Sequence, residues 1–450
     1  MKVLNRISVA VVMLAGSLAR GHGATDAPLP ETIFPELDGI LRQAVLQSPT
    51  MVSRALDLQI AENNRIEARA NLLPTLGGYG SYYETRDRRG DLAEPLDVSK
   101  IYYNFSINQP LFYWGERRNN ARMGEIQANI AKKQYRDAYR QFAQTLRGTY
   151  LQLIVLKLAA KRAQFNLDYN RTQLAQEEAR WAKKVISDAQ IAGVRVATDQ
   201  AQIASERAAY QFQITKESFA RLSGGPVLRD DEIPDSVPVL AHDGAFFDRL
   251  LAEYLGEKEP PTTAAEVMRQ QLKTLKLAYD IQKVRLRPKF SLVAGNSQDE
   301  QSYTLNTALK YKVNSLYGGI SVSWSLFDGF AKQAAVRSAL ARRRQMENDY
   351  ADLTKKLAQD AQAQVRMISF ASRDMAIADR ALTDKQGYLK GRQEDFARGT
   401  ASEADVSLMR LTVFDAEIYA QNIRVDYLTR VAEFLGTVVK DPVTANLANP

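Results

Sequence analysis

Two long stretches of this sequence contain no proline, and they limit what the chain can fold into. Proline is absent from residues 111–225 and again from residues 289–441, whereas five prolines crowd residues 226–262. Because proline interrupts helices, the two stretches permit uninterrupted helix. Residues 117–183 alone, at about 1.5 Å per residue, would form a rod on the order of 100 Å long. No globular core needs such a rod, so we expect two long helical blocks joined by an irregular linker.

The residue pattern inside these blocks supports helices that pack side by side. From Met346 to Ile368, apolar side chains recur at intervals of three and four residues, which is the period of one helix face. In the first block, alanines such as Ala201, Ala204 and Ala208 favour helix and allow neighbouring helices to approach closely. The blocks therefore read as long helical hairpins.

The chain also repeats itself. Leu73-Pro74 precedes one strand-like stretch, and Arg287-Pro288 precedes another 214 positions later. Residues 104–115 are echoed by residues 319–329, and both copies run directly into a helix. We interpret the chain as a tandem duplication of a unit with the order helix, strand, loop, strand, long helix, turn, long helix.

This duplication predicts the domain organisation. The expected parts are a signal peptide at 1–24; a first repeat at 25–225 with a helix, a β-hairpin at about 75–111 and a long helical hairpin at about 116–224; an irregular equatorial linker at 226–262; a second repeat at 263–440 with a helix, a β-hairpin at about 289–327 and a long helical hairpin at about 330–436; and a C-terminal tail at 441–450.

The first residues have the pattern of a secretory signal. Lys2 and Arg6 precede the apolar run 7–19, with cleavage expected after Ala19 or after Ala24. This run is too short to span a bilayer as a helix, which needs about 20 residues, and no later stretch comes close. We therefore expect an exported protein that can enter a membrane only as a closed β-barrel.

The composition excludes several classes of chemistry. There is no cysteine, which rules out disulfides, thiolate metal sites, a cysteine nucleophile and a cysteine-linked lipid. Only His22 and His242 supply imidazole, so a Ser-His-Asp site or a multi-histidine metal site lacks material. The net charge of +8 comes from interspersed basic and acidic residues, so no nucleic-acid partner is expected. We expect no enzyme activity, no metal and no cofactor.

The strand-like stretches alternate strictly between apolar and polar residues. In residues 320–326 every second residue is apolar and the others are serines, and residues 103–108 alternate in the same manner. Such strands have one apolar and one wet face. The candidate residues for the wet wall of a barrel lumen are Asn104, Ser106, Asn108, Ser321, Ser323 and Ser325.

Tyrosines cluster near the expected strand ends and favour a membrane interpretation of this alternation. A soluble sheet whose apolar face covers a core would also alternate. Strands of nearly ten residues with an aromatic girdle are typical of lipid-facing strands. The girdle candidates are Tyr79, Tyr82, Tyr83, Tyr102, Tyr103, Tyr303, Tyr311 and Tyr317. The polar segments 84–100 and 298–311 are expected to be external loops.

Each half offers only one hairpin, which gives four strands per chain. Transmembrane barrels begin at about eight strands, so four cannot close one. Since unpaired strand edges are not tolerated in lipid, a barrel must be shared between identical chains.

Three features together carry a family resemblance: Leu72-Leu73-Pro74 before a strand, the junctions 111–115 and 326–329, and the duplicated helical hairpins. Over essentially its whole mature length the chain resembles the TolC-like outer-membrane efflux proteins. The resemblance implies a homotrimer whose twelve strands form one outer-membrane barrel, continuous with a periplasmic α-helical barrel. It also implies passive conduction of substrates exported by an inner-membrane transporter and a periplasmic adaptor protein, in tripartite efflux or type I secretion. The alternative is a soluble periplasmic coiled-coil adaptor or scaffold.

Two departures from the family pattern are visible. Many relatives carry a lipid-modified cysteine at the mature N-terminus, which this chain lacks, so it is closer to the unlipidated members. At the helix tip, Phe396, Gly399 and Asp405 fit the family pattern. Ala401 stands where arginine is common, and Leu408 stands where a second aspartate is common.

The tips of the two helical hairpins hold the remaining candidate residues. Gly399 permits a left-handed turn and Ser402 can cap the next helix. Asp405 and Phe396 are candidates for a periplasmic gate, because a residue that recurs as a ring in a narrow lumen selects ions by charge. Aligning the first tip, 185–193, at an offset of 212 places Gly193 opposite Asp405, so the tips differ and adaptor grooves would alternate. The candidate docking residues are Arg398, Gly399, Thr400, Ala401, Ser402, Ser187 and Asp188.

Overall fold

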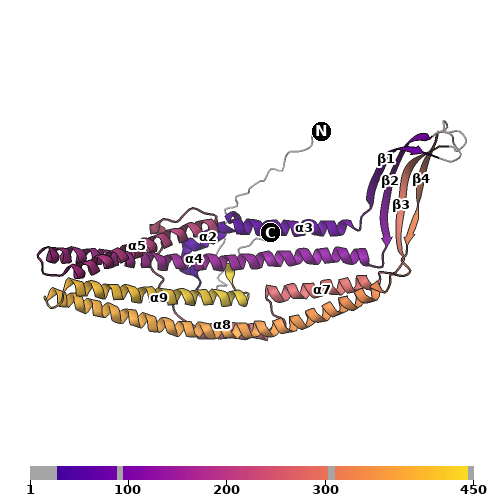
Figure 1. Ribbon diagram of the computed structural model, residues 1–450. Coiled ribbons are helices and arrows are strands. Elements are labelled where there is room, and N and C mark those ends of the chain that lie inside the picture. The colour runs from indigo at the N-terminus through magenta and orange to yellow at the C-terminus, as the bar shows by residue number, and fades with distance from the viewer. Residues whose placement is uncertain (1–27, 89–94, 303–309, 444–450) are drawn as a thin grey trace, which may run out of the picture.

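The computed structural model describes residues 28–88, 95–302 and 310–443. The expected signal peptide, Tyr303 and most of the expected C-terminal tail, residues 444–450, lie outside these ranges. Figure 1 shows an elongated, mainly helical molecule with a β-sheet at one end and the turns of two helical hairpins at the other. None of the helices in the described ranges is long and apolar enough to cross a membrane.

The elements follow one another in two similar series. The first series is α1 (Pro30–Ile33), α2 (Pro35–Gln47), α3 (Pro49–Ala70), β1 (Thr75–Asp87), β2 (Leu96–Phe112), α4 (Glu116–Ala182) and α5 (Asp188–Ser223). The second is the short η1 (Asp230–Glu232), α6 (Gly244–Gly256), α7 (Thr263–Lys283), β3 (Lys289–Ser302), β4 (Lys310–Ser323), α8 (Ala331–Ala397) and α9 (Glu403–Thr437). Both α4 and α8 contain 67 residues, and each begins where its strand pair ends.

The long helices predicted from the proline pattern are confirmed. The rod expected at 117–183 is α4, and it packs against α5 as a hairpin, as α8 packs against α9. The linker 226–262 is not wholly irregular, because α6 occupies 13 of its residues. The prolines lie on either side of α6, and the side chain of Asp243 caps its first turn by accepting from the Phe246 N–H.

The strands extend further into the expected loops than the sequence suggested. They contain 13, 17, 14 and 14 residues, so the segments predicted as external loops are partly strand. At the other end β4 stops at Ser323, whereas we expected it to reach Phe327. The alternation of apolar residues continues in the sequence beyond Ser323, but the pairing with β3 ends there. The indole N–H of Trp324 donates to the carbonyl of Leu286, and the chain then turns toward α8.

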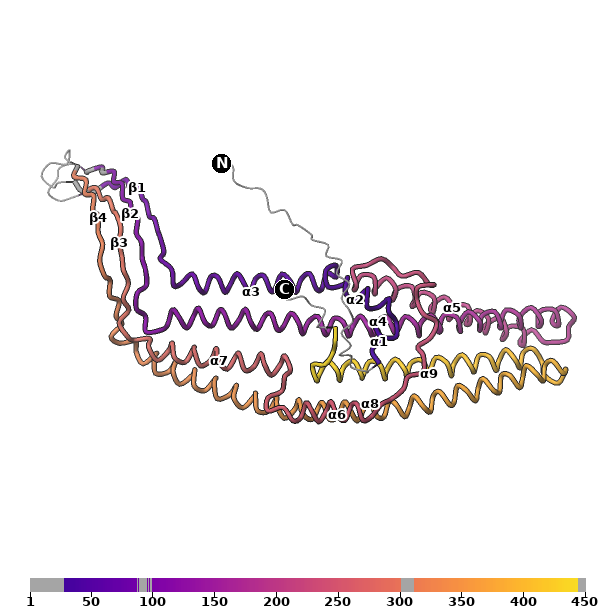
Figure 2. The backbone as a smooth tube through the Cα atoms, turned by 180° about the vertical axis from the view of Figure 1, so that it is seen from behind, coloured from indigo at the N-terminus to yellow at the C-terminus, as the bar shows by residue number. Residues whose placement is uncertain are grey.

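The four strands form one antiparallel sheet in the order β1-β2-β3-β4. The central β2–β3 pair joins the two halves of the chain, although the α4–α5 hairpin and α6 and α7 lie between them in sequence. Strands β1 and β4 are the edges, and each has one side without a strand partner in the described chain. Figure 2 shows the sheet turning away from the axis of the helices at the ends of α3 and α7.

The hydrophobic core lies in the middle of the molecule, away from both ends. One part packs α2 against α4 and α5 around Tyr139, Tyr150 and Phe219, and the other packs α6 against α8 and α9 around Phe247 and Phe434. Burial raises the pKa of Tyr139 and of Tyr150 to about 12, so both phenols stay neutral at physiological pH.

A buried ionic cluster fastens both ends of the described chain to this core. The Arg147 guanidinium in α4 donates to Asp441 at 2.7 Å and to Glu31 in α1 at 2.8 Å. Burial by itself disfavours the charged guanidinium, but the hydrogen bonds and negative charges of Asp441 and Glu31 outweigh it and raise the pKa of Arg147. The N-terminal and C-terminal segments are thus held at one point of α4.

Candidate functional site

The strand register determines which candidate residues share a face of the sheet. Asn104 lies opposite Tyr79 on one side and Ser297 on the other, and Ser106 lies between Gly77 and Gly295. Directly paired residues share a face, and successive residues alternate. By this rule one surface, the polar face, holds five of the six candidate lumen residues, namely Asn104, Ser106, Asn108, Ser321 and Ser323. Ser325 lies beyond the end of β4.

The opposite surface of the sheet, the apolar face, is open to its surroundings. It includes Leu76 at 77% exposure, Phe105 at 57% and Ile320 at 67%, with Ile107 and Val322 beside them. No other element of the described chain covers these side chains. An exposed apolar surface of this extent is typical of contact with lipid or with a partner.

The expected aromatic girdle is mostly on the other face. Tyr82 and Tyr103 do belong to the apolar face. The register places Tyr79, Tyr83, Tyr102, Tyr311 and Tyr317 on the polar face, beside the candidate lumen residues. Strand parity could have shown this from the sequence, because Tyr102 stands two residues before Asn104 and Tyr317 stands four before Ser321.

The tip between α8 and α9 has the predicted turn. Gly399 has a φ of 78°, and Thr400 closes the turn by donating its N–H to the carbonyl of Asp395 at 2.9 Å. The Ser402 hydroxyl accepts from the Asp405 N–H at 3.1 Å, and the Asp405 carboxylate accepts from the Ser402 N–H at 2.9 Å. This reciprocal capping box fixes the start of α9. The role of Ser402 as a cap is therefore confirmed.

The same box accounts for the electrostatic state of Asp405. Hydrogen bonds from the backbone and then from the side chain of Ser402 lower the pKa of the Asp405 carboxyl. The carboxylate is solvent-exposed and lies one helical turn from Leu408, whose side chain is also exposed. Phe396 is about half exposed at the end of α8, with Arg398 paired to Asp395 at 2.7 Å beside it. This tip therefore carries both an exposed acidic group and an exposed aromatic ring.

The tip between α4 and α5 repeats this backbone geometry 215 positions earlier. Ser187 forms the equivalent capping box with Gln190, and Lys184 takes the left-handed turn position with a φ of 58°. The expected offset of 212, which placed Gly193 opposite Asp405, is therefore wrong. The position equivalent to Asp405 is Gln190, which sequence reasoning missed. A search for Ser-x-x-Gln and Ser-x-x-Asp boxes would have found it.

The two tips share a backbone but differ in side-chain chemistry. In the first tip the Trp181 indole N–H donates to Asp188 at 2.7 Å, and the Arg195 guanidinium lies 5.5 Å from the Trp181 ring. Trp181 is the equivalent of Phe396, and neutral Gln190 stands where the second tip has an acid. The two tips therefore do differ in side-chain chemistry. The pair of residues that distinguishes them is Asp405 and Gln190, not Asp405 and Gly193.

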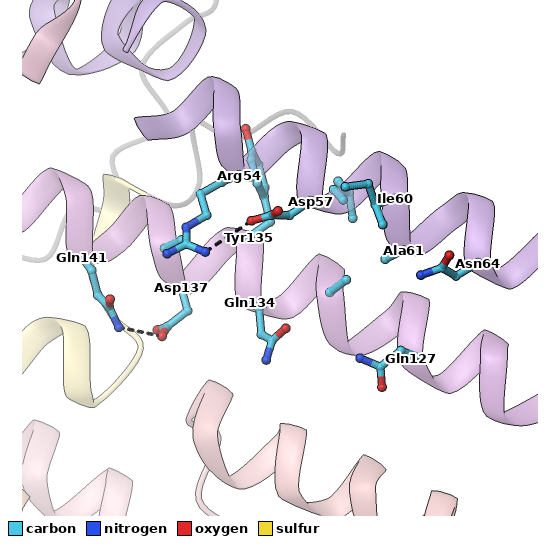
Figure 3. A pocket seen from close by; sticks show the side chains of 13 residues that line it. Arg54, Asp57, Ile60, Ala61, Asn64, Gln127, Gln134, Tyr135, Asp137 and Gln141 are labelled. Carbon is cyan, nitrogen blue, oxygen red and sulfur yellow. Dashed lines mark hydrogen bonds and ion pairs between the residues drawn. The ribbon is translucent and has the colours of Figure 1, made fainter. Parts of the chain in front are cut away.

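Figure 3 shows a groove between α3 and α4 on the helical shaft, with a volume of about 460 Å³. Its charged groups are engaged locally: Arg54 pairs with Asp57 at 3.3 Å, and Gln141 donates to Asp137 at 3.0 Å. Ile60 on α3 stays more than half exposed at its margin. The groove is an open helix–helix surface without converging catalytic groups.

Metal ligands do not gather in the described ranges. No group of three or more histidine, cysteine, aspartate or glutamate side chains is placed there to hold an ion.

Comparisons with known proteins give a consistent result. Residues 40–225 match the family model described as outer membrane efflux protein. No curated protein matches the sequence. The fold is similar to that of the outer membrane protein VceC from Vibrio cholerae, at 14% identity and a TM-score of 0.63, covering 90% of this chain and 96% of VceC.

Two further solved structures have the same fold. The CmeC outer membrane channel of Campylobacter jejuni is 11% identical with a TM-score of 0.68, covering 92% of this chain and 90% of CmeC. The open state of the MtrE outer membrane channel of Neisseria gonorrhoeae is 14% identical with a TM-score of 0.65, covering 90% and 89%. The two-faced sheet and the duplicated helical hairpins agree with these comparisons: residues 40–225 are similar to the outer membrane efflux protein family, and the chain shares its fold with solved outer membrane channels.

Proposed function

We propose that three copies of this chain form one twelve-stranded barrel in the outer membrane, continuous with a helical barrel in the periplasm. The observation that carries the proposal is a four-stranded sheet that has one apolar face, one polar face and two free edges. In lipid such a sheet must close on itself, and four strands are too few. Pairing β1 of one copy with β4 of the next satisfies both edges.

The helices support the same assembly. On α5 an exposed stripe recurs every seven residues at Val196, Ile203 and Tyr210, and on α8 Phe370 and Ile377 are exposed at the same spacing. Seven-residue spacing of apolar side chains is the pattern of a seam between long helices. Each copy therefore offers apolar seams that its own helices leave uncovered, in addition to the groove beside α3.

On this arrangement the protein conducts substrates passively, and an inner-membrane transporter and a periplasmic adaptor supply them. The polar face lines the barrel, and the two kinds of tip alternate at the periplasmic end, where adaptors dock against residues 187–188 and 398–402. Asp405 and Phe396 line the periplasmic constriction. The relatives support this proposal, since CmeC and MtrE are described as outer membrane channels.

The test is to measure the mass of the protein–detergent complex and then its conductance in planar bilayers. We expect a protein mass three times that of one chain and discrete current steps. A stable single chain without pore activity would contradict the proposal. Release of the protein from membranes by carbonate alone would favour the soluble adaptor or scaffold instead.

A further inference from the structure

We propose that the polar face of the sheet carries a binding platform for planar aromatic molecules, formed by Tyr79, Tyr83, Tyr102 and Tyr317 around Asn104. We call this set the tyrosine platform. The inference rests on the proposed function, because the platform faces the lumen only if the sheet closes into a channel. The tyrosine platform is then the place on the transport path where a passing molecule is held.

A chain of hydrogen bonds and ring contacts links the platform across the sheet. The Tyr317 hydroxyl donates to the Asn104 side-chain oxygen at 3.3 Å, and the Asn104 amide donates to the Tyr102 hydroxyl at 3.4 Å. The Tyr102 and Tyr79 rings lie 5.9 Å apart, and the Tyr79 and Tyr83 hydroxyls are 3.1 Å apart. Side chains from β1, β2 and β4 thus hold one another in place.

Strand β3 contributes by making room. Gly295 lies directly opposite Tyr317, and a Cβ atom added at Gly295 would be 2.5 Å from the Tyr317 hydroxyl and 2.6 Å from its ring carbon Cζ. The Tyr317 side chain therefore lies across the glycine and reaches the Asn104 side chain on β2. A side chain at Gly295 would push the ring off the sheet.

The platform has the chemistry of a stacking site. Tyr79 and Tyr83 are more than half exposed and Tyr317 is 39% exposed, so ring surface is available above the network. Aromatic rings bind planar π-systems by offset stacking, and rings that are already held lose little freedom on binding. Lys100 lies opposite Tyr83, and Asp299 is on the same face in β3. Charges of both signs flank the rings, so we assign the selectivity to planar shape.

The test uses ethidium, a planar aromatic cation, against tetraethylammonium, which carries the same charge without a ring. In planar bilayers, ethidium should block the channel reversibly at concentrations where tetraethylammonium does not. Replacing three platform rings together, Tyr79→Leu, Tyr102→Leu and Tyr317→Leu, should raise the half-blocking ethidium concentration by at least about tenfold, as expected for loss of stacking.

The matched control is the double variant Tyr82→Leu and Tyr103→Leu, which removes two rings from the apolar face. Ethidium should block this variant at the same concentration at which it blocks the unaltered protein. A platform variant that is blocked as well as the control, or ethidium block no stronger than tetraethylammonium block, would overturn the inference.

A second measurement separates this inference from the proposed function. Ethidium binding to detergent-solubilised protein, followed by fluorescence anisotropy, reads the platform without any current. Binding that the triple variant weakens about tenfold supports the platform even if no current flows, in which case only the channel proposal fails. Equal binding by both variants overturns the platform whatever the conductance is.

Discussion

The middle of the molecule and its sheet end use apolar residues in opposite ways. In the middle, Tyr139, Leu146 and Phe434 have essentially no exposed surface, and even the Arg147 guanidinium is buried against two acids. At the sheet, Leu76 and Ile320 keep most of their surface exposed. The buried core of the middle is therefore complete within one chain, whereas the sheet end depends on its surroundings.

The largest effect is expected from Arg147→Met. The substitution leaves Glu31 and Asp441 buried without their cation, and breaking a buried ion pair costs about 3–5 kcal/mol. The thermal unfolding midpoint of the solubilised protein should fall clearly. As the control, Arg343→Met breaks the exposed Arg343–Glu347 pair, which is worth no more than about 1 kcal/mol. Equal midpoints for the two variants would show that the middle does not depend on this cluster.

A second substitution pair tests the two faces of the sheet. Ile320→Lys places a charge on the apolar face, where lysine in a lipid-facing strand costs about 2–4 kcal/mol at mid-depth. Ser321→Lys places the same charge one residue further on the polar face and should assemble normally while shifting ion selectivity. Membrane assembly is measured by heat-resistant oligomer on gels, and selectivity by the reversal potential in a salt gradient. Similar assembly of both variants would refute the lipid-facing assignment.

The smallest effect is expected at the tips and depends on pH. Because the pKa of Asp405 is lowered in the folded chain, its capping of α9 is fully present above the ordinary carboxyl value of 3.8. The contribution is lost as the pH falls through the lowered value. Amide hydrogen exchange in the first turn of α9 should therefore accelerate in acid relative to the first turn of α5, where Gln190 does not titrate. Asp405→Asn should remove the difference between the tips, and a difference that persists in this variant would exclude Asp405 as its source.

Much of the fold could be predicted because its signals are local. Missing prolines and a three-to-four spacing were enough to identify α4 and α8, and the duplication indicated the paired hairpins. The predicted alternation was also correct for Asn104 and Ser106 against Phe105, since parity along one strand decides the face.

The remainder depends on relations between distant segments. The girdle was assigned from the nearness of tyrosines to strand ends, whereas their face depends on parity, so Tyr79 and Tyr317 were misplaced. The tip offset was wrong because the repeats do not keep one spacing throughout: the strand motifs lie 214 positions apart and the capping boxes 215. No local pattern connects Arg147 with Glu31 and Asp441, since that cluster exists only after the chain has folded.

The position of that cluster affects how the protein is made. Asp441 comes 294 residues after Arg147, so the guanidinium gains its second acid only when the chain extends through Asp441. A polypeptide cut short before Asp441 would bury a cation that has lost half of its neutralising charge. The ionic cluster therefore makes the folding of the central core depend on the segment that carries Asp441.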